Sequence, residues 1–252
     1  MTDADLAIRL VRDAGSLAAT MRAGGLEASF KTSISDVVTA ADHAAEELVA
    51  QVLRDERPDD GVLGEEGAST AGSTGRRWVV DPVDGTYNFL SGLAYWCSAI
   101  ALEDADGVVV GAVHQPVTGE TWVGGRDLAT TLDGVPVAPL VDRSLAEVSL
   151  ATYVHPTTLD DPDVAEPWHA IVGGAATLRV LGSGSCDLAG VAGGRIGVWA
   201  QHSTAEWDWL PGKALVEAAG GRTEVLEHRG HRWHVAGNGR AVGELLTLLL
   251  AS

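Results

Sequence analysis

The chain has 252 residues, of which 46% are hydrophobic and 21% charged, so it can build a full core in one large or two small domains. Its formal charge of -18 argues against general binding to nucleic acid or to anionic membranes, because phosphate groups repel an acidic surface. The N-terminus has no basic-then-apolar leader, and no apolar run approaches the ~20 residues that span a bilayer. We therefore expect a cytoplasmic protein, with Cys97 and Cys186 as reduced core residues.

The first half of the chain is predicted to pack helices on an antiparallel sheet. Apolar residues recur at helical spacing over residues 5–22 and 39–57, which predicts two helices. Short hydrophobic runs bounded by turn residues predict strands at 61–64, 77–80, 98–103, 108–114 and 120–123.

The second half alternates between the two kinds of element, which is typical of an α/β layer. Strands are predicted at 147–153, 177–181, 196–200 and near Trp233, and helices at 164–172, 185–192, 206–219 and 241–250. We place the boundary near residue 142, so that a first domain (1–142) carries most candidate metal ligands. The second domain (143–252) carries Asp208 and the candidate substrate residues.

The most informative segment is Asp81-Pro82-Val83-Asp84-Gly85-Thr86, which directly follows a hydrophobic strand. Two carboxylates this close repel each other unless a cation lies between them, and Mg²⁺ or Ca²⁺ prefers oxygen ligands. The Gly85-Thr86 pair is expected to open a short helix whose N–H groups suit a phosphate. An ordinary Asp-Pro turn is the alternative, and the segment alone leaves both interpretations open.

Three other acidic sites accompany this segment. Glu65 and Glu66 lie between Gly64 and Gly67, Asp36 and Asp42 flank a Val-Val-Thr stretch, and Asp208 follows Trp207 at a predicted helix start. Each has an ordinary explanation by itself. The glutamates could be a solvated surface pair, Asp42 could cap the N-terminus of the following helix, and Asp208 could be an ordinary acidic residue in a first helical turn.

Taken in order, the four sites resemble the inositol monophosphatase-like family of metal-dependent phosphatases, which includes inositol, histidinol, sugar and nucleotide phosphatases. Residues 81–89 match the family's Asp-Pro-x-Asp-Gly-Thr-x-Asn-Phe signature, and residues 64–66 match its Gly-Glu-Glu element. Residues 36–42 match Asp-x-Val-Thr-x-x-Asp, and Trp207-Asp208 with residues 217–221 match the downstream elements. The resemblance runs from about Lys31 to the end of the chain.

The resemblance implies a fold, a reaction and a set of metal ligands. The fold would be a layered α-β-α-β-α sandwich of the sugar-phosphatase type, of mixed α+β and α/β character, in a homodimer. The reaction would be hydrolysis of a phosphate monoester with two or three Mg²⁺ ions, which Mn²⁺ or Ca²⁺ can replace in binding. Glu65, Asp81 and the Val83 carbonyl would hold one ion, and Asp81, Asp84 and Asp208 a second. A third, weaker ion would bind Glu65 and water.

The resemblance also assigns roles around the attacking water. Glu65, Asp42 and Thr86 would be catalytic, with Thr86 and Asp42 orienting and helping to deprotonate the water. The N–H groups of Gly85 and Thr86 would hold the phosphate. Lys31 and Asp36 would belong to a mobile loop that closes over the site.

The alcohol part of the substrate is left open. Gln201 stands where inositol-selective relatives carry a glutamate, and Gly184 replaces an alanine that contacts the ring; Ser183 and Arg179 complete the candidate substrate residues. Inositol, histidinol, a sugar or a nucleoside would each fit.

Two alternative functions are left open. A nucleotide 3′-phosphatase or sugar bisphosphatase is the alternative enzyme, with Arg179 as its candidate contact to a second phosphate. A catalytically inactive regulatory homologue is the alternative from another class, although such a protein is expected to have lost a metal carboxylate.

Overall fold

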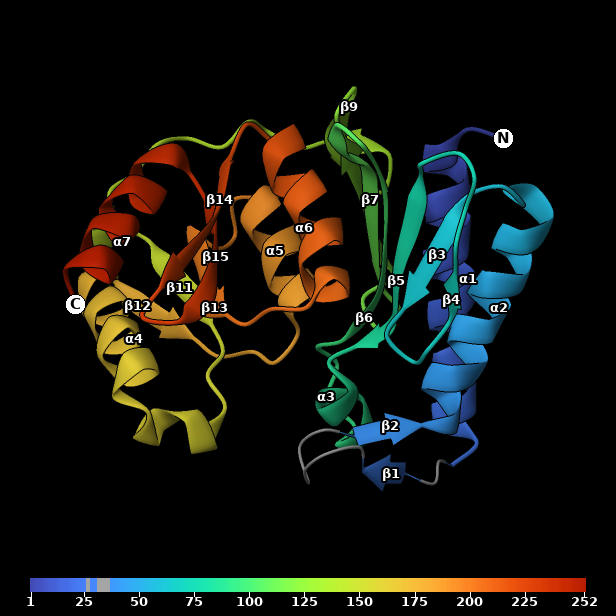
Figure 1. The fold of residues 1–252 in the computed structure, drawn as a ribbon, viewed down its shortest axis with the longest axis horizontal. Coiled ribbons are helices and arrows are strands. Elements are labelled where there is room, and N and C mark those ends of the chain that lie inside the picture. Colours follow the sequence, from blue (N-terminus) through green and yellow to red (C-terminus); the bar gives the residue numbers. More distant parts are fainter. Residues whose placement is uncertain (26–27, 31–36) are drawn as a thin grey trace.

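In the computed structural model, which describes residues 1–25, 28–30 and 37–252, the chain forms five layers in the order α-β-α-β-α (Figure 1). A large sheet and a smaller sheet enclose a middle pair of helices, and a further pair of helices covers the outer face of each sheet. This arrangement confirms the predicted layered sandwich.

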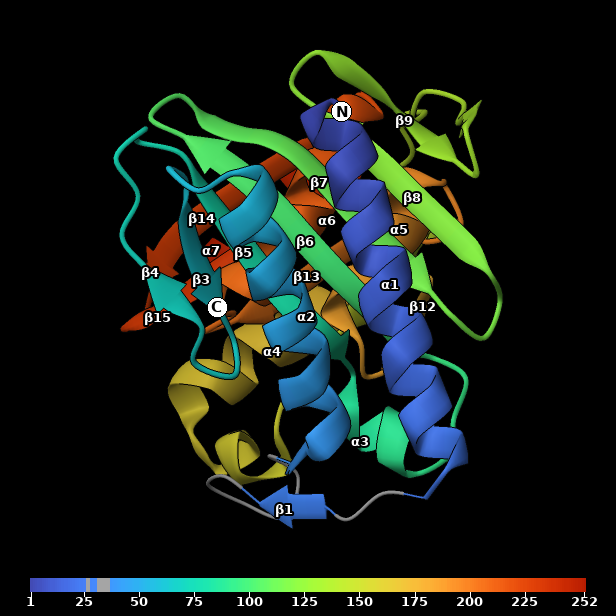
Figure 2. The ribbon, with the colours of Figure 1, turned by 90° about the vertical axis from the view of Figure 1, so that its right-hand side faces the viewer.

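Helices α1 (Asp3–Ala23) and α2 (Ala40–Glu56) cover the outer face of the large sheet (Figure 2). Each buries one stripe of small and aliphatic residues, as an amphipathic helix on a sheet does. In α1, the Thr2 hydroxyl accepts the backbone N–H of Asp5 and the Asp5 carboxylate binds back to Thr2, which forms a capping box. Both helices match the predicted ranges to within two residues.

The large sheet has eight strands in the order β10-β9-β8-β7-β6-β5-β3-β4. Their bounds are β3 Gly61–Gly64, β4 Ser69–Thr70, β5 Arg77–Asp84, β6 Cys97–Asp104, β7 Gly107–Gln115, β8 Glu120–Gly125, β9 Leu128–Leu132 and β10 Val135–Pro136. The sheet is antiparallel as expected except at one place, where β3 pairs with β5 in parallel. The chain doubles back through β4 between them, so both strands run in the same direction.

The smaller sheet has the order β12-β11-β13-β15-β14. Its bounds are β11 Ser149–Thr152, β12 Thr177–Arg179, β13 Val198–His202, β14 Arg222–His228 and β15 His231–Gly237. Strand β11 is parallel to β12 and β13, whereas β15 is antiparallel to both β13 and β14. Helices connect the parallel strands, as the predicted α/β alternation requires.

The remaining helices lie on the two faces of the smaller sheet. Helices α5 (Gly184–Ala192) and α6 (Glu206–Ala218) form the middle layer, and α4 (Pro162–Gly174) and α7 (Gly239–Ala251) form the outer one. The short elements are β1 Ala28–Phe30, β2 Val37–Thr39, α3 Thr86–Leu90 and two 3₁₀ turns, Leu145–Glu147 and Pro156–Asp160. In the part of the chain that the structure describes, no helix has both the length and the apolar character needed to cross a bilayer.

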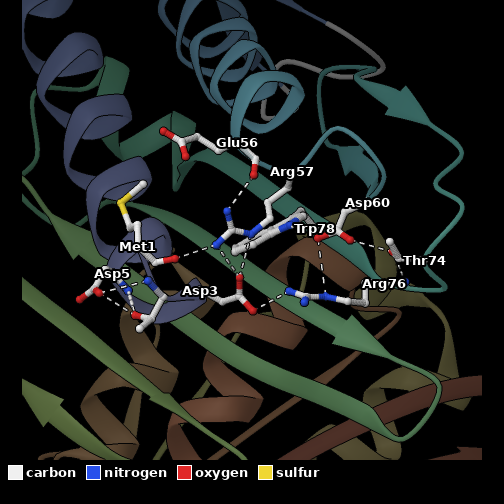
Figure 3. A network of polar contacts seen from close by, with 10 residues as sticks. Met1, Asp3, Asp5, Glu56, Arg57, Asp60, Thr74, Arg76 and Trp78 are labelled. Carbon is white, nitrogen blue, oxygen red and sulfur yellow. Dashed lines mark hydrogen bonds and ion pairs between the residues drawn. The ribbon is translucent and has the colours of Figure 1, made fainter.

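A polar network ties the start of α1 to the strand that leads into the site (Figure 3). The Asp3 carboxylate accepts from Arg57 at the end of α2 (3.0 Å) and from Arg76 before β5 (2.6 Å). Nearby, the buried Asp60 carboxylate accepts the indole N–H of Trp78 in β5 at 3.0 Å. These contacts fix both outer helices to one end of β5, whose other end carries the Asp81 motif.

Candidate metal centre

Strand β5 contains an irregularity between its two aspartates that decides where their side chains point. Asp81 pairs with Ala99 of β6, but Asp84 pairs with Cys97, so two residues of β5 lie opposite one residue of β6. In a regular strand, residues three apart point to opposite faces of the sheet. The extra residue of this β-bulge brings both carboxylates onto the face that α5 and α6 cover.

The bulge satisfies its own backbone groups. Pro82 has no N–H to donate, and its carbonyl accepts the hydroxyl of the buried Ser98 at 2.6 Å. The Val83 N–H donates to Asp81 Oδ1 at 3.1 Å, and the Val83 carbonyl accepts the Thr86 hydroxyl at 3.0 Å. Since unpaired buried backbone groups are costly, these contacts make the bulge a stable feature of the strand.

Asp84 is held by the start of α5, on the other side of the site. Its Oδ2 accepts the Ser183 hydroxyl at 2.9 Å and the Ser185 backbone N–H at 2.5 Å. Gly182, with φ +84°, makes the turn that brings these donors into place. Burial raises the pKa of Asp84, and these donors oppose part of that rise.

Asp208, in the first turn of α6, completes a cluster of carboxylates. One oxygen each from Asp81, Asp84 and Asp208 lies within 4.8 Å of the others. Burial raises the pKa of Asp81 well above its usual range, and the neighbouring carboxylates of Glu65, Asp84, Asp208 and Asp42 raise it further. Burial and the charges of Asp84 and Glu65 likewise raise the pKa of Asp208.

This donor set fits a hard divalent cation. The three side chains offer only oxygen atoms, and, besides burial, four carboxylates act together to raise the pKa of Asp81, namely Glu65, Asp84, Asp208 and Asp42. A cation among them would remove the mutual repulsion that raises these pKa values. The cluster corresponds to the ligands that the resemblance implies for the second ion.

Glu65 lies on the loop between β3 and β4, near the same cluster. Its backbone N–H donates to Val80 in β5 at 3.2 Å, and its charge acts on Asp81 and Asp208. The following Glu66 is not the solvated surface residue that a Glu pair usually provides, because its side chain is only 2% exposed. The loop therefore turns inward.

Thr86, the first residue of α3, lies next to Asp42 of α2. The Thr86 hydroxyl lies 3.2 Å from Oδ1 of Asp42, which is fully buried in the first turn of α2. Gly85 precedes Thr86 with φ +91°, and an added Cβ there would lie 3.0 Å from the Gly182 carbonyl oxygen. The tight turn and the close approach of the two segments both favour glycine at this position.

The structure places the candidate substrate residues at different distances from the cluster. An added Cβ on Gly184 would lie 3.9 Å from the Asp208 Cβ, so Gly184 borders the centre, and Ser183 binds Asp84 directly. Gln201 is half-buried in β13, on the same face as Trp199, whose ring also borders Gly184. Arg179 is exposed on the edge strand β12, where its guanidinium donates to Thr177 and Leu178 of its own strand.

Some residues of the site were not predicted, and two predicted ones cannot be placed. Lys31 and Asp36 lie outside the described residues. Sequence reasoning did not identify Ser98 or Glu46, and it assigned Ser183 to the substrate rather than to Asp84. Only the spacing of Glu46 four residues after Asp42, on one face of a predicted helix, could have indicated that Glu46 also faces inward.

Comparison with known proteins gives a family and several relatives. The sequence model described as "Inositol monophosphatase family" matches residues 2–248. A histidinol-phosphatase of Mycobacterium tuberculosis is 36% identical over 230 residues, which cover 85% of each chain. An inositol-1-monophosphatase of Rhizobium meliloti is 33% identical over 198 residues, covering 78% of this chain and 74% of that protein.

The fold is also similar to those of solved structures. The extragenic suppressor protein suhB from Bartonella henselae superimposes with a TM-score of 0.88 at 26% identity, and the match covers 97% of each chain. The likeness therefore includes both sheets and all three helix layers.

Proposed function

This chain belongs to the inositol monophosphatase family, and on that premise we propose that it hydrolyses the phosphate monoester of a small alcohol with the help of Mg²⁺. The observation that carries the proposal is the cluster of Asp81, Asp84 and Asp208, whose oxygens lie within 4.8 Å of one another. The two similar phosphatases support the reaction class, because both are named for the release of phosphate from a small alcohol.

Two ligand sets follow from the cluster and its neighbours. Asp81, Asp84 and Asp208 would hold one Mg²⁺ ion, and Asp81, Glu65 and the Val83 carbonyl a second, with Asp81 shared between them. When bound, the ions would neutralise the phosphate charge and lower the pKa of the attacking water. A third ion at Glu65 is the weaker expectation.

The chain's own groups would orient the water and the phosphate. The Thr86 hydroxyl hydrogen has two acceptors within reach, the Val83 carbonyl at 3.0 Å and Oδ1 of Asp42 at 3.2 Å. With the Val83 carbonyl bound to an ion, the hydrogen would point to the Asp42 carboxylate, and the hydroxyl oxygen would accept a hydrogen bond from the water. Gly85 adopts a left-handed backbone conformation just before α3. The N–H groups of Gly85 and Thr86 at this turn would bind the phosphate oxygens. The buried Asp42 would act as the fixed acceptor that orients this hydroxyl.

The alcohol would lie between the starts of α5 and α6 and the end of β13. Gly184 borders that space, and Gln201, on the same face of β13 as Trp199, would offer a neutral carboxamide to a substrate hydroxyl. Inositol and histidinol phosphates lead the candidates because they are named in the similar proteins. A nucleotide or sugar bisphosphate is less favoured, since the guanidinium of Arg179 binds back to its own strand.

A regulatory protein without catalysis is the alternative from another class, which the similarity to a suppressor protein raises. The presence of Glu65, Asp81, Asp84 and Asp208 favours catalysis, because a protein that had lost the reaction would not need all four. Homodimer assembly and a cytoplasmic location remain predictions.

One assay tests the proposal. Phosphate release is measured from inositol, histidinol, sugar and nucleotide phosphates, with Mg²⁺ and with EDTA. We expect Mg²⁺-dependent release from at least one ester, and loss of that release in Asp84→Asn, because the amide removes a ligand charge. Asp106→Asn, in the exposed turn between β6 and β7, is the matched control and should behave as the wild type.

Near-normal activity in a folded Asp84→Asn variant would contradict the metal assignment. Absence of phosphate release from every ester, with Mg²⁺ bound, would favour the regulatory alternative. The selectivity of the site is tested with Gln201→Ala. This variant should change the relative kcat/KM among the esters, and an unchanged ranking would remove Gln201 from the substrate contacts.

A further inference from the structure

We propose that Glu46 of α2 is a positioning residue for the metal centre, because its buried carboxylate fixes the loop that carries Glu65. The inference rests on the proposed function, since Glu65 is proposed there as a metal ligand. Glu46 itself is not a ligand in this proposal and acts through the loop.

The contacts of Glu46 are short and involve both of its oxygens. Its side chain lies in the interior, with 4% of the residue exposed. Oε2 accepts the backbone N–H of Glu66 at 2.7 Å, and Oε1 accepts the backbone N–H of Ala68, also at 2.7 Å. One carboxylate thus binds the loop immediately after Glu65 at two points.

Glu65 is held from its other side by the large sheet. Its N–H donates to Val80 at 3.2 Å, one residue before Asp81 in β5. Gly64 donates to the Ala68 carbonyl at 2.7 Å, which closes the loop on itself. The backbone of Glu65 is therefore fixed between β5 and the Glu46 carboxylate, which sets the point from which its side chain reaches the cluster.

Gly64 shows independently that the carboxylate and the loop are closely fitted. A Cβ added at Gly64 would lie 2.2 Å from Oε2 of Glu46 and 2.4 Å from its carboxyl carbon. A contact this short is impossible, so a side chain here would displace the carboxylate or the loop. Glycine at this position is explained by the approach of Glu46.

Helix α2 connects Glu46 with Thr86 and Asp42, the pair that is proposed to orient the attacking water. Asp42 and Glu46 are four residues apart, one above the other on the buried face of the helix. Asp42 accepts the Thr86 hydroxyl and Glu46 holds the Glu65 loop. A single turn of this helix therefore sets the position of Asp42 relative to the loop that carries Glu65, the proposed ligand.

A carboxylate is needed at this position because it faces two donors. A charged acceptor forms shorter and stronger hydrogen bonds with N–H groups than a neutral one does. In Glu46→Gln, the amide nitrogen would face one of the two N–H groups as a second donor, and that contact would be lost. Changes in groups that orient metal ligands typically weaken metal binding by about 10- to 100-fold.

The test is a calorimetric titration of Mg²⁺ into metal-free protein, with the Mg²⁺ dependence of phosphate release as the second measurement. Glu46→Gln is expected to raise the Kd for Mg²⁺ by about 10-fold or more. Its kcat should return toward the wild-type value at saturating Mg²⁺, a recovery that general structural damage would not give. Glu47→Gln is the matched control, because the neighbouring Glu47 is exposed and pairs with Arg54 at 2.6 Å.

Gly64→Ala supplies a second variant that keeps the carboxylate and disturbs only its fit. It should weaken Mg²⁺ binding in the same direction, and it carries the test if Glu46→Gln gives no cooperative thermal transition. Wild-type affinity for Mg²⁺ in a folded Glu46→Gln or Gly64→Ala protein would overturn the role of Glu46 alone. Failure of the wild type itself to bind Mg²⁺ would overturn the metal site and this inference together.

Discussion

At the scale of single residues, the site depends on buried carboxyl groups with different partners. Asp81, Asp84 and Asp208 face one another, which suits a cation. Asp187, one turn into α5, instead accepts the Tyr95 hydroxyl at 2.8 Å, and burial raises its pKa to about 8. Asp187 therefore keeps its proton in the folded protein at a pH where the unfolded chain has lost it.

This difference predicts how Asp187→Asn changes stability with pH. Between about pH 4 and pH 8 the folded state holds a proton that the unfolded state does not, so this residue lowers the free energy of unfolding as pH rises. Asparagine carries no such proton and can still accept from Tyr95. The variant should therefore gain stability relative to the wild type from pH 5 to pH 8, by at most about 1.4 kcal/mol per pH unit.

Urea unfolding in EDTA at the two pH values measures this gain. The other buried carboxyl groups contribute to the slope of both proteins, so the difference between them isolates Asp187. Parallel stability curves for the two proteins would show that Asp187 titrates normally.

At the scale of elements, helix α6 positions Asp208 through its close packing on the large sheet. Gly111 of β7 lies directly beneath the helix, and a Cβ there would lie 2.3 Å from the Pro211 carbonyl oxygen. Proline inside the helix removes a backbone N–H, yet the helix continues through it. Glycine in β7 thus allows α6 to approach the sheet closely enough for Asp208 to reach Asp81 and Asp84.

Gly111→Ala should therefore disturb both stability and the metal centre. Forcing a methyl group against backbone costs about 1–3 kcal/mol in the free energy of unfolding, and the shift of α6 should weaken Mg²⁺ binding as well. Gly173→Ala in α4 is the control, because nothing lies within 4 Å of an added Cβ there. Chemical denaturation and Mg²⁺ titration of both variants make the comparison, and equal behaviour would refute the packing argument.

The periodicity of apolar residues in the sequence predicted the bounds of a helix or strand well where one face of that element is buried. The ranges of α1 and α2 follow from their apolar stripes, whereas β14 was not predicted because none of its residues is fully buried. Asp81, Asp84 and Asp208 were candidate ligands because the acidic motifs together resemble the inositol monophosphatase family, whereas each motif alone has an ordinary explanation. The contacts of Glu46 and Ser183 could not be predicted, because their partners are 20 or more residues away and depend on tertiary packing.

At the scale of the whole molecule, the candidate metal centre joins the two halves. Asp81 and Asp84 come from the large sheet, and Asp208 comes from the helix that follows β13 of the smaller sheet. Asn88 makes a second connection, since its amide donates to the carbonyls of Tyr95 (2.8 Å) and Leu181 (2.7 Å). The division into residues 1–142 and 143–252 remains a prediction about folding units.

Mg²⁺ should accordingly stabilise the whole molecule. A ligand at about 100 times its Kd adds about 2.7 kcal/mol to the free energy of unfolding, which corresponds to a rise in Tm of roughly 5–10 °C for a protein of this size. Differential scanning calorimetry with and without Mg²⁺ measures the shift. NaCl at equal ionic strength is the control, because the charge of -18 also responds to screening. An equal shift in NaCl would show that no specific site is involved.

The bulge in β5 has a consequence for transplanting this chemistry to other proteins. The six residues from Asp81 to Thr86 place their carboxylates on one face only because Cys97 and Ala99 of β6 accept the extra residue and Ser98 binds the Pro82 carbonyl. Grafting those six residues onto a regular hairpin would point one aspartate away from the other. A designer would have to copy the adjoining strand β6 as well, so the smallest segment that can be grafted with this motif is the pair β5 and β6.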